Sequence, residues 1–277
     1  MKRLVLVSLF ASSTALAQPL EVETPPAPPV VQSLLPNLFA TTLGTSAEVR
    51  FDYSNLDGID VAVLNVLVHV QYLTPQGFGG YARLPFAYVE DSDDGIDFGG
   101  SGIGNLEVGG LYVVKLAPNT DLLARGGVSI DTASEDDQLA ITLSTILPRL
   151  IDTYATGLET TWARGQVQIR HAIDNIRIGG AIGMDVPVAG DGADEDGLVG
   201  MVNGVVAVGL QQGQLGLGLS LAMLQPISDE DDENLMGLNV GADYAINPNV
   251  RLFAQIGVSL EDNADGTAAG VGGRSTF

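Results

Sequence analysis

From residue 45 to the end of the chain, apolar and polar residues alternate at every second position through long stretches of sequence. In residues 215–223, leucine or methionine stands at each odd position and glycine, serine or alanine at each even one. Successive side chains of a β-strand point to opposite faces, so this period predicts strands with one apolar face. Most stretches hold about ten to thirteen residues, whereas strands of globular domains average about five or six. At a tilt near 45°, a strand of this length crosses a hydrocarbon layer of about 25 Å.

The alternation predicts twelve strands. They are Thr45–Tyr53, Val61–Tyr72, Phe78–Val89, Gly104–Leu116, Thr120–Ile130, Gly157–Ile173, Ile176–Val188, Leu198–Leu210, Gln214–Pro226, Leu235–Ile246, Val250–Leu260 and Thr267–Phe277. One further apolar segment, residues 138–151, lies inside the connection that follows the fifth strand. Its apolar residues suit one helical face, which favours a short helix or loop folded into the interior. The alternative is an extra strand pair, which would make fourteen strands.

The connections between the predicted strands alternate in kind. Short ones such as 174–175 and 247–249 carry the Pro, Asn and Asp residues that tight turns require. Between them lie six acidic connections, which hold 24 of the 34 acidic residues and a single basic residue, Arg149. In an up-and-down meander, alternate connections emerge at the same end, so one end is short and the other long and negative. Because this asymmetry is typical of outer-membrane barrels, the sequence predicts an all-β fold, a transmembrane antiparallel up-and-down β-barrel.

The first 44 residues differ from the rest. Residues 1–17 combine two basic residues, an apolar run too short to span a bilayer and an Ala-x-Ala cleavage pattern, which predicts a secretory signal peptide. Residues 18–44 hold six prolines and predict a periplasmic lead-in without regular structure, either a free tail or a segment tucked into something larger. Residues 45–277 form the predicted barrel, and we expect it in the outer membrane of a Gram-negative envelope.

Composition excludes several classes of function. The chain has no cysteine, which removes disulfides, thiolate metal sites and cysteine nucleophiles. A formal net charge of −22 argues against nucleic-acid binding, which needs concentrated Lys and Arg. His69 and His171 are far apart in sequence, and neither a nucleophile elbow nor a zinc-protease motif occurs. We therefore expect no enzyme activity, no cofactor and no resident metal ion.

The acidic connections are rich in the oxygen ligands that Ca²⁺ and Mg²⁺ prefer, but none fits the twelve-residue EF-hand pattern. Solvated loops that prevent association are the favoured interpretation. Weak, shared binding of divalent cations near lipopolysaccharide is the alternative. The expected partners are therefore outer-membrane lipid, lipopolysaccharide and small solutes.

The phase of the polar residues predicts which side chains face the lumen. In a membrane barrel the apolar phase faces lipid and the polar phase faces the interior. Nine of the ten basic residues that follow the signal peptide lie inside predicted strands, most of them on the polar phase. The side chains that we expect to line the pore are Arg50, Arg83, Lys115, Arg125, Arg164, Arg170, Arg177, Arg251, Glu48, Glu107 and Asp185.

Residues 100–114, GSGIGNLEVGGLYVV, form a glycine-rich start to a strand. The segment resembles the Gly-x-Gly-(Asp)-(Leu) strand entry of a family of outer-membrane barrels associated with meta-pathway degradation of phenols. The matching residues are Gly102, Gly104, Leu106, Gly109 and Tyr112, and Asn105 stands where the family has Asp. The resemblance covers this strand, and elsewhere in residues 45–277 only the rhythm of strands. It implies uptake of small molecules, aromatic ones among them, and carries over no catalytic or binding residue.

A barrel of twelve strands lies between filled eight-stranded barrels and open sixteen-stranded porins, so a narrow or plugged channel is expected. We expect passive passage of small solutes through a polar lumen. The acidic loops would concentrate cations at the mouth, while the lumen arginines would favour anionic or carboxylated groups deeper in. The rival interpretation is a structural or surface-interaction barrel, whose arginines and acids pair across a filled, non-conducting lumen.

Overall fold

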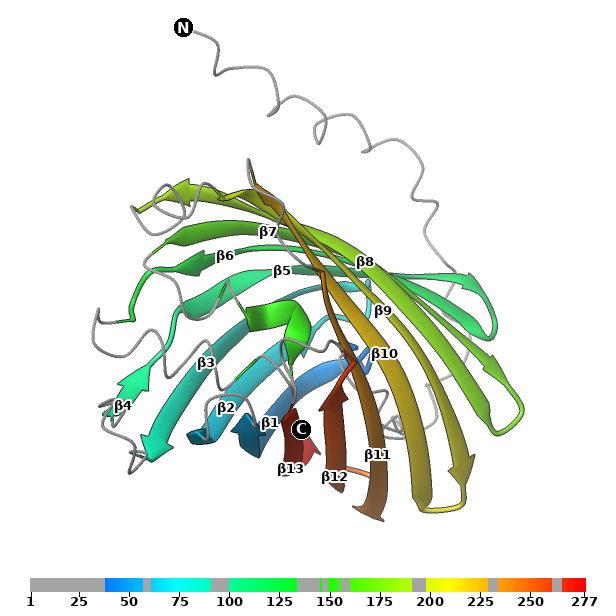
Figure 1. Cartoon of the computed structure of the whole chain (residues 1–277). Coiled ribbons are helices and arrows are strands. Elements are labelled where there is room, and N and C mark those ends of the chain that lie inside the picture. The colour runs from blue at the N-terminus through cyan, green and yellow to red at the C-terminus, as the bar shows by residue number, and fades with distance from the viewer. Residues whose placement is uncertain are drawn as a thin grey trace, which may run out of the picture.

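The computed structural model describes residues 38–56, 61–90, 100–133, 145, 149–153, 155, 160–190, 198–228, 234–260 and 266–277. Its strands form one antiparallel sheet, and the pairings of β1 with β13 and of β2 with β3 close that sheet into a barrel (Figure 1). The strands are β1 (Gly44–Leu56), β2 (Val61–Leu73), β3 (Phe78–Glu90), β4 (Gly100–Ile103), β5 (Leu106–Ala117), β6 (Thr120–Ile130), β7 (Thr161–Ile173), β8 (Ile176–Ala189), β9 (Leu198–Gln212), β10 (Leu215–Ser228), β11 (Leu235–Asn247), β12 (Val250–Ser259) and β13 (Gly266–Thr276). Within the described ranges, no helix is long and apolar enough to span a membrane.

β4 and β5 occupy one position in the wall, because both pair with β3 at successive registers. The sheet is therefore a closed antiparallel barrel of twelve strands, which confirms the predicted fold and strand number. The alternative of fourteen strands is wrong. Part of the apolar segment 138–151 instead folds inward, where Leu150–Asp152 form the short 3₁₀ helix η2. Figure 1 shows helical turns of this connection, in green, inside the ring of strands.

The predicted strands overlap the observed ones, with two corrections at their starts. The fourth was predicted from Gly104, but this wall strand begins at Gly100 and breaks before Leu106. The break arises because the Asn105 side chain is fully buried and bonds to loop backbone, accepting from Thr132 N–H at 3.0 Å and donating to Thr160 O at 3.3 Å. The sixth was predicted from Gly157; residues 157–159 lie outside the described ranges, and β7 begins at Thr161, after Thr160, whose carbonyl accepts from Asn105.

The two faces of the wall follow the predicted phase. In β1 the polar side chains at 46, 48, 50, 52 and 54 are buried, whereas the apolar ones at 49, 51 and 53 are 40, 46 and 52% exposed. Each of the remaining strands of the wall likewise contributes exposed apolar side chains, from Leu64 in β2 to Val271 in β13. The outer surface is thus an apolar belt suited to lipid, while closure pairs the backbone groups of every wall strand.

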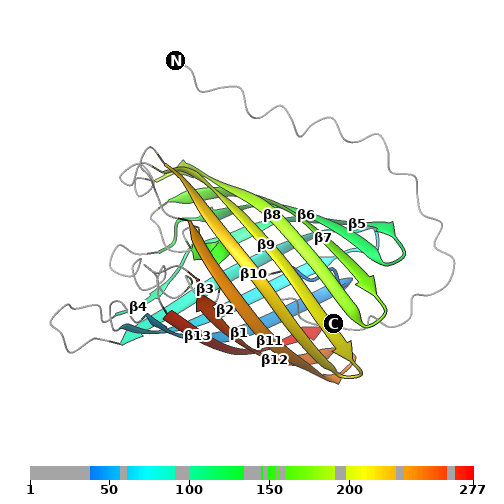
Figure 2. The same cartoon turned by 45° about the vertical axis from the view of Figure 1, so that its right-hand side comes forward.

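The two rims of the barrel differ. At one rim short hairpins join β2–β3, β5–β6, β7–β8, β9–β10 and β11–β12 (Figure 2). In two of them Asp174 (φ 52°) and Gly213 (φ 61°) adopt the left-handed conformation that these residue types tolerate in tight turns. Phe277 lies at the same rim, where its N–H donates to Thr45 O at 2.9 Å. The six predicted acidic connections leave from the opposite rim, and most of their residues lie outside the described ranges.

Two segments enter the lumen. Leu38, Phe39 and Ala40, at the end of the Pro-rich lead-in, are only 3–6% exposed, because they lie inside the barrel. η2 belongs to a connection that leaves from the acidic rim, and it is buried inside the barrel: Leu150 and Ile151 are 2 and 3% exposed. For its described residues, the lead-in is therefore the tucked-in segment that the sequence left as one of two alternatives.

Glycines within the strands make room for large side chains in the lumen. Tyr81 on β3 lies over Gly109 on β5 and Gly127 on β6. A Cβ atom at Gly109 would come within 2.6 Å of the Tyr81 ring, and one at Gly127 within 2.6 Å of its hydroxyl. Glycine weakens a strand because it adds no side chain and loses more conformational entropy. Here it lets Tyr81 reach the charged side chains described next.

Candidate functional site

Three arginines on different wall strands converge on one carboxylate inside the lumen. Glu107 on β5 accepts hydrogen bonds from Arg125 at 2.9 Å, from Arg164 at 2.7 Å and from Arg83 at 3.4 Å. The Tyr81 hydroxyl donates to the same carboxylate at 2.5 Å. All four charged side chains are at most 10% exposed. A carboxylate this deeply buried is stable only because cations and a hydroxyl replace its water shell.

The inserted segment contributes a second carboxylate, Asp152. Arg83 holds it through two parallel hydrogen bonds of 3.0 and 2.6 Å, and Arg164 adds a third at 3.1 Å. Arg164 also pairs with Asp185 on β8 through two bonds of 3.1 Å. Burial raises the pKa of Asp152, but Arg83, Arg164 and Arg149 together lower it by more, so its pKa lies well below the ordinary value. Asp152 is therefore an ionised side chain clamped by two guanidinium groups.

This depressed pKa predicts how η2 responds to acid. A carboxylate whose pKa is lowered by folding stabilises the fold above its unfolded pKa of about 3.9, and this contribution is lost only as pH falls through the folded value. We expect the fluorescence of Trp162, which belongs to the same buried apolar cluster as η2, to stay unchanged between pH 7 and pH 5. A red shift of its emission already near pH 4 to 5 would contradict the clamped, ionised state of Asp152.

Arg149 precedes η2 and is 2% exposed, yet none of its guanidinium nitrogens has a hydrogen-bond acceptor among the described residues. Burial, with a smaller effect of Arg83, lowers its pKa to about 10, against the opposing effect of Asp152. At neutral pH the group is still protonated. We call Arg83, Arg125, Arg149, Arg164, Glu107, Asp152 and Asp185 the charge cluster. With four cations and three carboxylates, it carries one surplus positive charge.

Apolar residues pack around η2 next to the charge cluster. Leu150 and Ile151 form a buried cluster with wall residues that include Trp162, Met201 and Leu224. Trp162 is 0% exposed and is the single tryptophan of the chain. The lumen is therefore not polar throughout, and that part of the prediction is wrong. Inward wall positions on β7, β9 and β10 are apolar because the inserted segment supplies apolar partners for them.

The lead-in contacts the charge cluster through Phe39. The centroid of its ring lies 4.3 Å from the guanidinium carbon of Arg125 and 5.3 Å from that of Arg83, distances at which a cation is attracted to an aromatic face. The backbone of Phe39 is bound by Gln168, which accepts from its N–H and donates to its C=O, both at 2.9 Å. Gln71 donates to the next carbonyl at 2.9 Å. Leu38 belongs to the apolar cluster that also contains Leu150 and Ile151 of η2, so both inserted segments contribute to one buried cluster.

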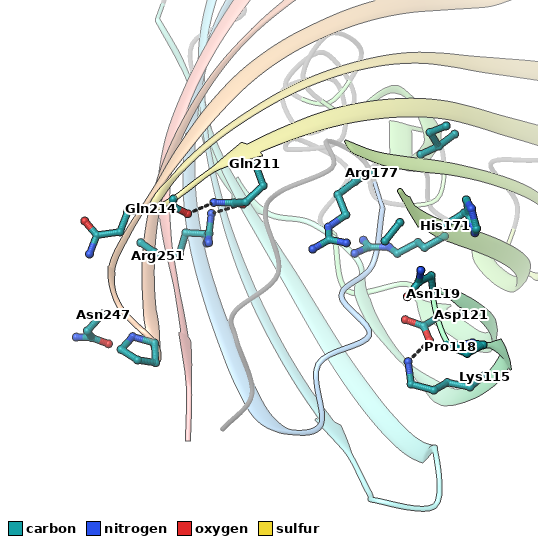
Figure 3. A pocket seen from close by; sticks show the side chains of 16 residues that line it. Lys115, Pro118, Asn119, Asp121, His171, Arg177, Gln211, Gln214, Asn247 and Arg251 are labelled. Atoms are coloured by element: carbon teal, nitrogen blue, oxygen red, sulfur yellow. Dashed lines mark hydrogen bonds and ion pairs between the residues drawn. The ribbon is translucent and has the colours of Figure 1, made fainter. Parts of the chain in front are cut away.

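A cavity of about 520 Å³ lies at the short-turn rim, lined by residues from β5 to β12 and their turns (Figure 3). Its basic side chains are Lys115, Arg170, Arg177 and Arg251. The one acidic lining residue, Asp121, pairs with Lys115 at 3.0 Å. In Figure 3 the side chain of Arg177 extends into the space between the opposite sides of the cavity, where no described carboxylate pairs with it. Arg251 also forms an ion pair with Asp243 on β11, so two of the four cations are paired and the cavity keeps a net positive charge.

The structure divides the predicted pore-lining residues into three groups. Arg83, Arg125, Arg164, Glu107 and Asp185 meet in the charge cluster, whereas Lys115, Arg170, Arg177 and Arg251 surround the cavity. Elsewhere in the lumen, Arg50 donates to Asp52 at 2.8 Å and Glu48 accepts from Arg274. The side chain of Lys115 is 63% exposed at the rim. That these residues line a conduction path stays a prediction.

Sequence reasoning missed four residues of the site: Phe39, Tyr81, Arg149 and Asp152. One signal was available, because Arg149 is the single basic residue in connections otherwise crowded with acids. A cation retained in such a segment needs a local reason, and here it lies beside Asp152 in the lumen. Tyr81 stands two positions before Arg83, so the period of two places it on the same inward phase, but no sequence pattern links it to Glu107. Phe39 gave no comparable signal because it lies outside the predicted strands.

A closed antiparallel barrel of twelve strands, with an apolar outer belt and one rim of short turns, defines an outer-membrane β-barrel. The outer membrane is therefore the location of the protein, as predicted. Its inner surface is mixed, with a charge cluster and an apolar cluster, and the lumen contains parts of its own chain.

Comparisons with known proteins agree at the level of the fold. No protein-family model matches the chain, and no curated protein sequence does. Among solved structures, the KdgM porin matches with a TM-score of 0.53 and 12% identity over 83% of this chain and 99% of that one. A KdgM porin in complex with disordered oligogalacturonate gives 0.54 and 11% over 84% and 99%. The beta domain of the Bordetella autotransporter Brka gives 0.50 and 13% over 84% and 99%.

At these identities the likeness concerns the fold alone. It supports the outer-membrane barrel. It does not distinguish a porin, whose lumen passes solutes, from a barrel with another function. The resemblance of residues 100–114 to the barrels associated with phenol degradation is matched by no family model and stays a prediction.

Proposed function

We propose that the protein is an outer-membrane channel for small anionic solutes, held closed in this conformation by its lead-in and its inserted segment. The observation that carries this proposal is the distribution of cations in the lumen. Four basic side chains surround the cavity at the short-turn rim, two of them paired with Asp121 and Asp243, and four arginines face three carboxylates in the charge cluster further in. Both places therefore hold more cations than carboxylates. Fixed positive charges in a low-dielectric passage attract anions and repel cations.

The solute class follows from size and charge. A cavity of about 520 Å³ falls in the range of small-molecule sites. Arginine forks recognise carboxylates with two parallel hydrogen bonds, so carboxylated solutes fit better than inorganic anions. The resemblance to barrels associated with phenol degradation adds aromatic acids to the candidates, and one similar porin was solved with oligogalacturonate. Benzoate and galacturonate are therefore the first test solutes.

The acidic rim belongs to the same proposal. The long connections of outer-membrane barrels face the cell exterior, so solutes would meet the acidic loops first. Contact with lipopolysaccharide and weak binding of Ca²⁺ or Mg²⁺ are proposed for these loops, whose acids lie mostly outside the described residues. Export by residues 1–17 and the periplasmic course of the early lead-in are proposed on the sequence alone.

The direct test is single-channel recording of the refolded protein in a planar bilayer under a salt gradient. Folding is first verified by the heat-dependent shift of the barrel in gel electrophoresis. Current steps with a reversal potential that favours anions would support the channel. Folded, inserted protein that gives no current, even with the lead-in removed and Asp152 replaced by Asn, would exclude it.

Arg177 offers a specific prediction. We expect Arg177→Gln to move the reversal potential toward cation selectivity, because it removes a fixed charge that extends into the cavity. Arg177→Lys retains the charge in the same place and serves as the matched control, with selectivity close to that of the unchanged protein. Equal reversal potentials for the Gln and Lys variants would show that ions do not pass Arg177.

A second candidate function is a structural or surface-interaction barrel with a filled lumen. It is favoured by the pairing of buried charges, since Glu107, Asp152 and Asp185 all bond to arginines. In that case the segments inside the lumen complete a static core. The recordings above separate the two functions, because a static core gives no current in any variant that still folds.

A further inference from the structure

Arg83 and Arg164, two residues of the barrel wall, bind a carboxylate that comes from the inserted segment. Arg83 belongs to β3 and Arg164 to β7, whereas Asp152 comes from the inserted segment. Without Asp152, the wall presents three arginines against Glu107 and Asp185, a surplus of one positive charge. The wall site is therefore complementary to one further carboxylate, and Asp152 supplies it.

The geometry of this contact is that of ligand recognition. Both oxygens of Asp152 accept from the guanidinium fork of Arg83, at 3.0 and 2.6 Å, and Arg164 adds a bond at 3.1 Å. Nothing in the fork distinguishes the carboxylate of Asp152 from that of a free organic acid, since the contact involves only the two oxygens.

The lead-in supplies an aromatic ring next to the same arginines. Arg83 also lies 5.3 Å from the ring centroid of Phe39, and Arg125 lies 4.3 Å from it. Tyr81 packs edge-on against the same ring, with centroids 5.3 Å apart. Around Arg83 the chain thus places an aromatic ring and a carboxylate on two separate segments. A single small molecule that carries both groups could replace both.

Arg149 indicates that this part of the lumen has capacity for more negative charge. It is buried beside Asp152, and none of its guanidinium nitrogens has an acceptor among the described residues. Leaving a buried donor unpaired is unfavourable, so an anion that reaches the charge cluster gains a further partner.

We propose that Arg83, Arg125 and Arg164 form a binding site for aromatic carboxylates, and that Asp152 and Phe39 are its internal ligands, which such a solute displaces. The inference rests on the proposed function only in that displacement would open the lumen. Binding and displacement can be measured on protein that carries no current. The site would make the solute itself the signal for opening.

The experiment uses the whole mature chain refolded in detergent micelles, with Trp162 as the reporter. Trp162 belongs to the same buried apolar cluster as Leu150, Ile151 and Leu38, so displacement of either segment opens the cluster and gives its ring a more polar environment. We expect phenylacetate to produce a saturable red shift of its emission. Acetate at equal ionic strength should need a several-fold higher concentration because it lacks the ring. Phenylacetamide should give no shift because it lacks the charge.

Variants assign the effect to the internal ligand. Asp152→Asn weakens the contact of the loop with the arginines, so the phenylacetate midpoint should fall about tenfold, the equivalent of one charge-assisted hydrogen bond. Asp243→Asn is the matched control. Asp243 is also a buried luminal carboxylate paired with an arginine, but its partner Arg251 lies outside the charge cluster, so the midpoint should stay within about twofold.

Arg83→Gln should abolish the saturable shift if the variant folds, as judged by the heat-dependent gel shift. Wild-type protein that shows no saturable shift would overturn the inference, and so would equal midpoints for phenylacetate and phenylacetamide. Equal changes in Asp152→Asn and Asp243→Asn would reduce the effect to overall charge and also overturn it. A saturable shift without any channel current would keep the binding site and refute the proposed channel. Current without the shift would do the reverse.

Discussion

Arg164→Met is expected to lower the free energy of unfolding by about 3–5 kcal/mol, the largest effect of a single substitution in this barrel. Arg164 is 1% exposed at its side chain and bonds to Glu107, Asp152 and Asp185. Methionine fills a similar volume but leaves these carboxylates without their shared cation. The loss therefore comes from uncompensated buried charge more than from lost packing. Denaturant titration of the protein in detergent micelles measures it.

Arg149→Met is the matched comparison, because it removes the same charge from the same cluster. Arg149 has no hydrogen-bond acceptor among the described residues, so the substitution relieves an unsatisfied buried cation. We expect the free energy of unfolding to rise by about 1–3 kcal/mol. Opposite signs for the two variants would confirm that pairing decides the contribution of each arginine. A loss of stability in both would show that Arg149 has an essential partner.

Removing residues 18–43 together with Asp152→Asn is expected to raise single-channel conductance several-fold. The inserted segment is held by two sets of contacts, the ion pairs of Asp152 and the apolar cluster that includes Leu38 of the lead-in. Resistances in series add, so the narrowest remaining constriction limits the current. Each change alone should therefore give only a small part of the combined increase.

The reference for this comparison is a chain that starts at the same residue but retains Asp152. β1 begins at Gly44, so the truncation leaves every wall strand intact. If the truncated chain already reaches the full conductance, the inserted segment is no constriction. If the double change leaves conductance at the wild-type level, the charge cluster and apolar wall themselves close the lumen, and the structural function gains support.

The wall of the barrel can be derived from the amino-acid sequence alone. The alternation of apolar and polar residues does not depend on how the strands are arranged, because successive side chains of any strand point to opposite faces. Strand length, the alternation of short and acidic connections and the phase of residues such as Arg50 then decided the twelve strands and their inward faces. The same phase indicated that Arg83, Arg125 and Arg164 point inward. It could not indicate that these three meet at Glu107, since that depends on strand register and tilt around the barrel.

The contents of the lumen depend on tertiary contacts that the sequence pattern does not show. The positions of Phe39 and Asp152 are set by long-range contacts with Arg125, Arg83 and Arg164, and no local pattern encodes a contact between segments far apart in the chain. Asn105 is a similar case, since it ends a strand that periodicity would continue, by bonding to backbone near residue 160. Alternation is a property of each strand alone and can be read along the chain. The lumen is a property of the closed barrel, because its contacts exist only once all twelve strands have brought their inner faces together.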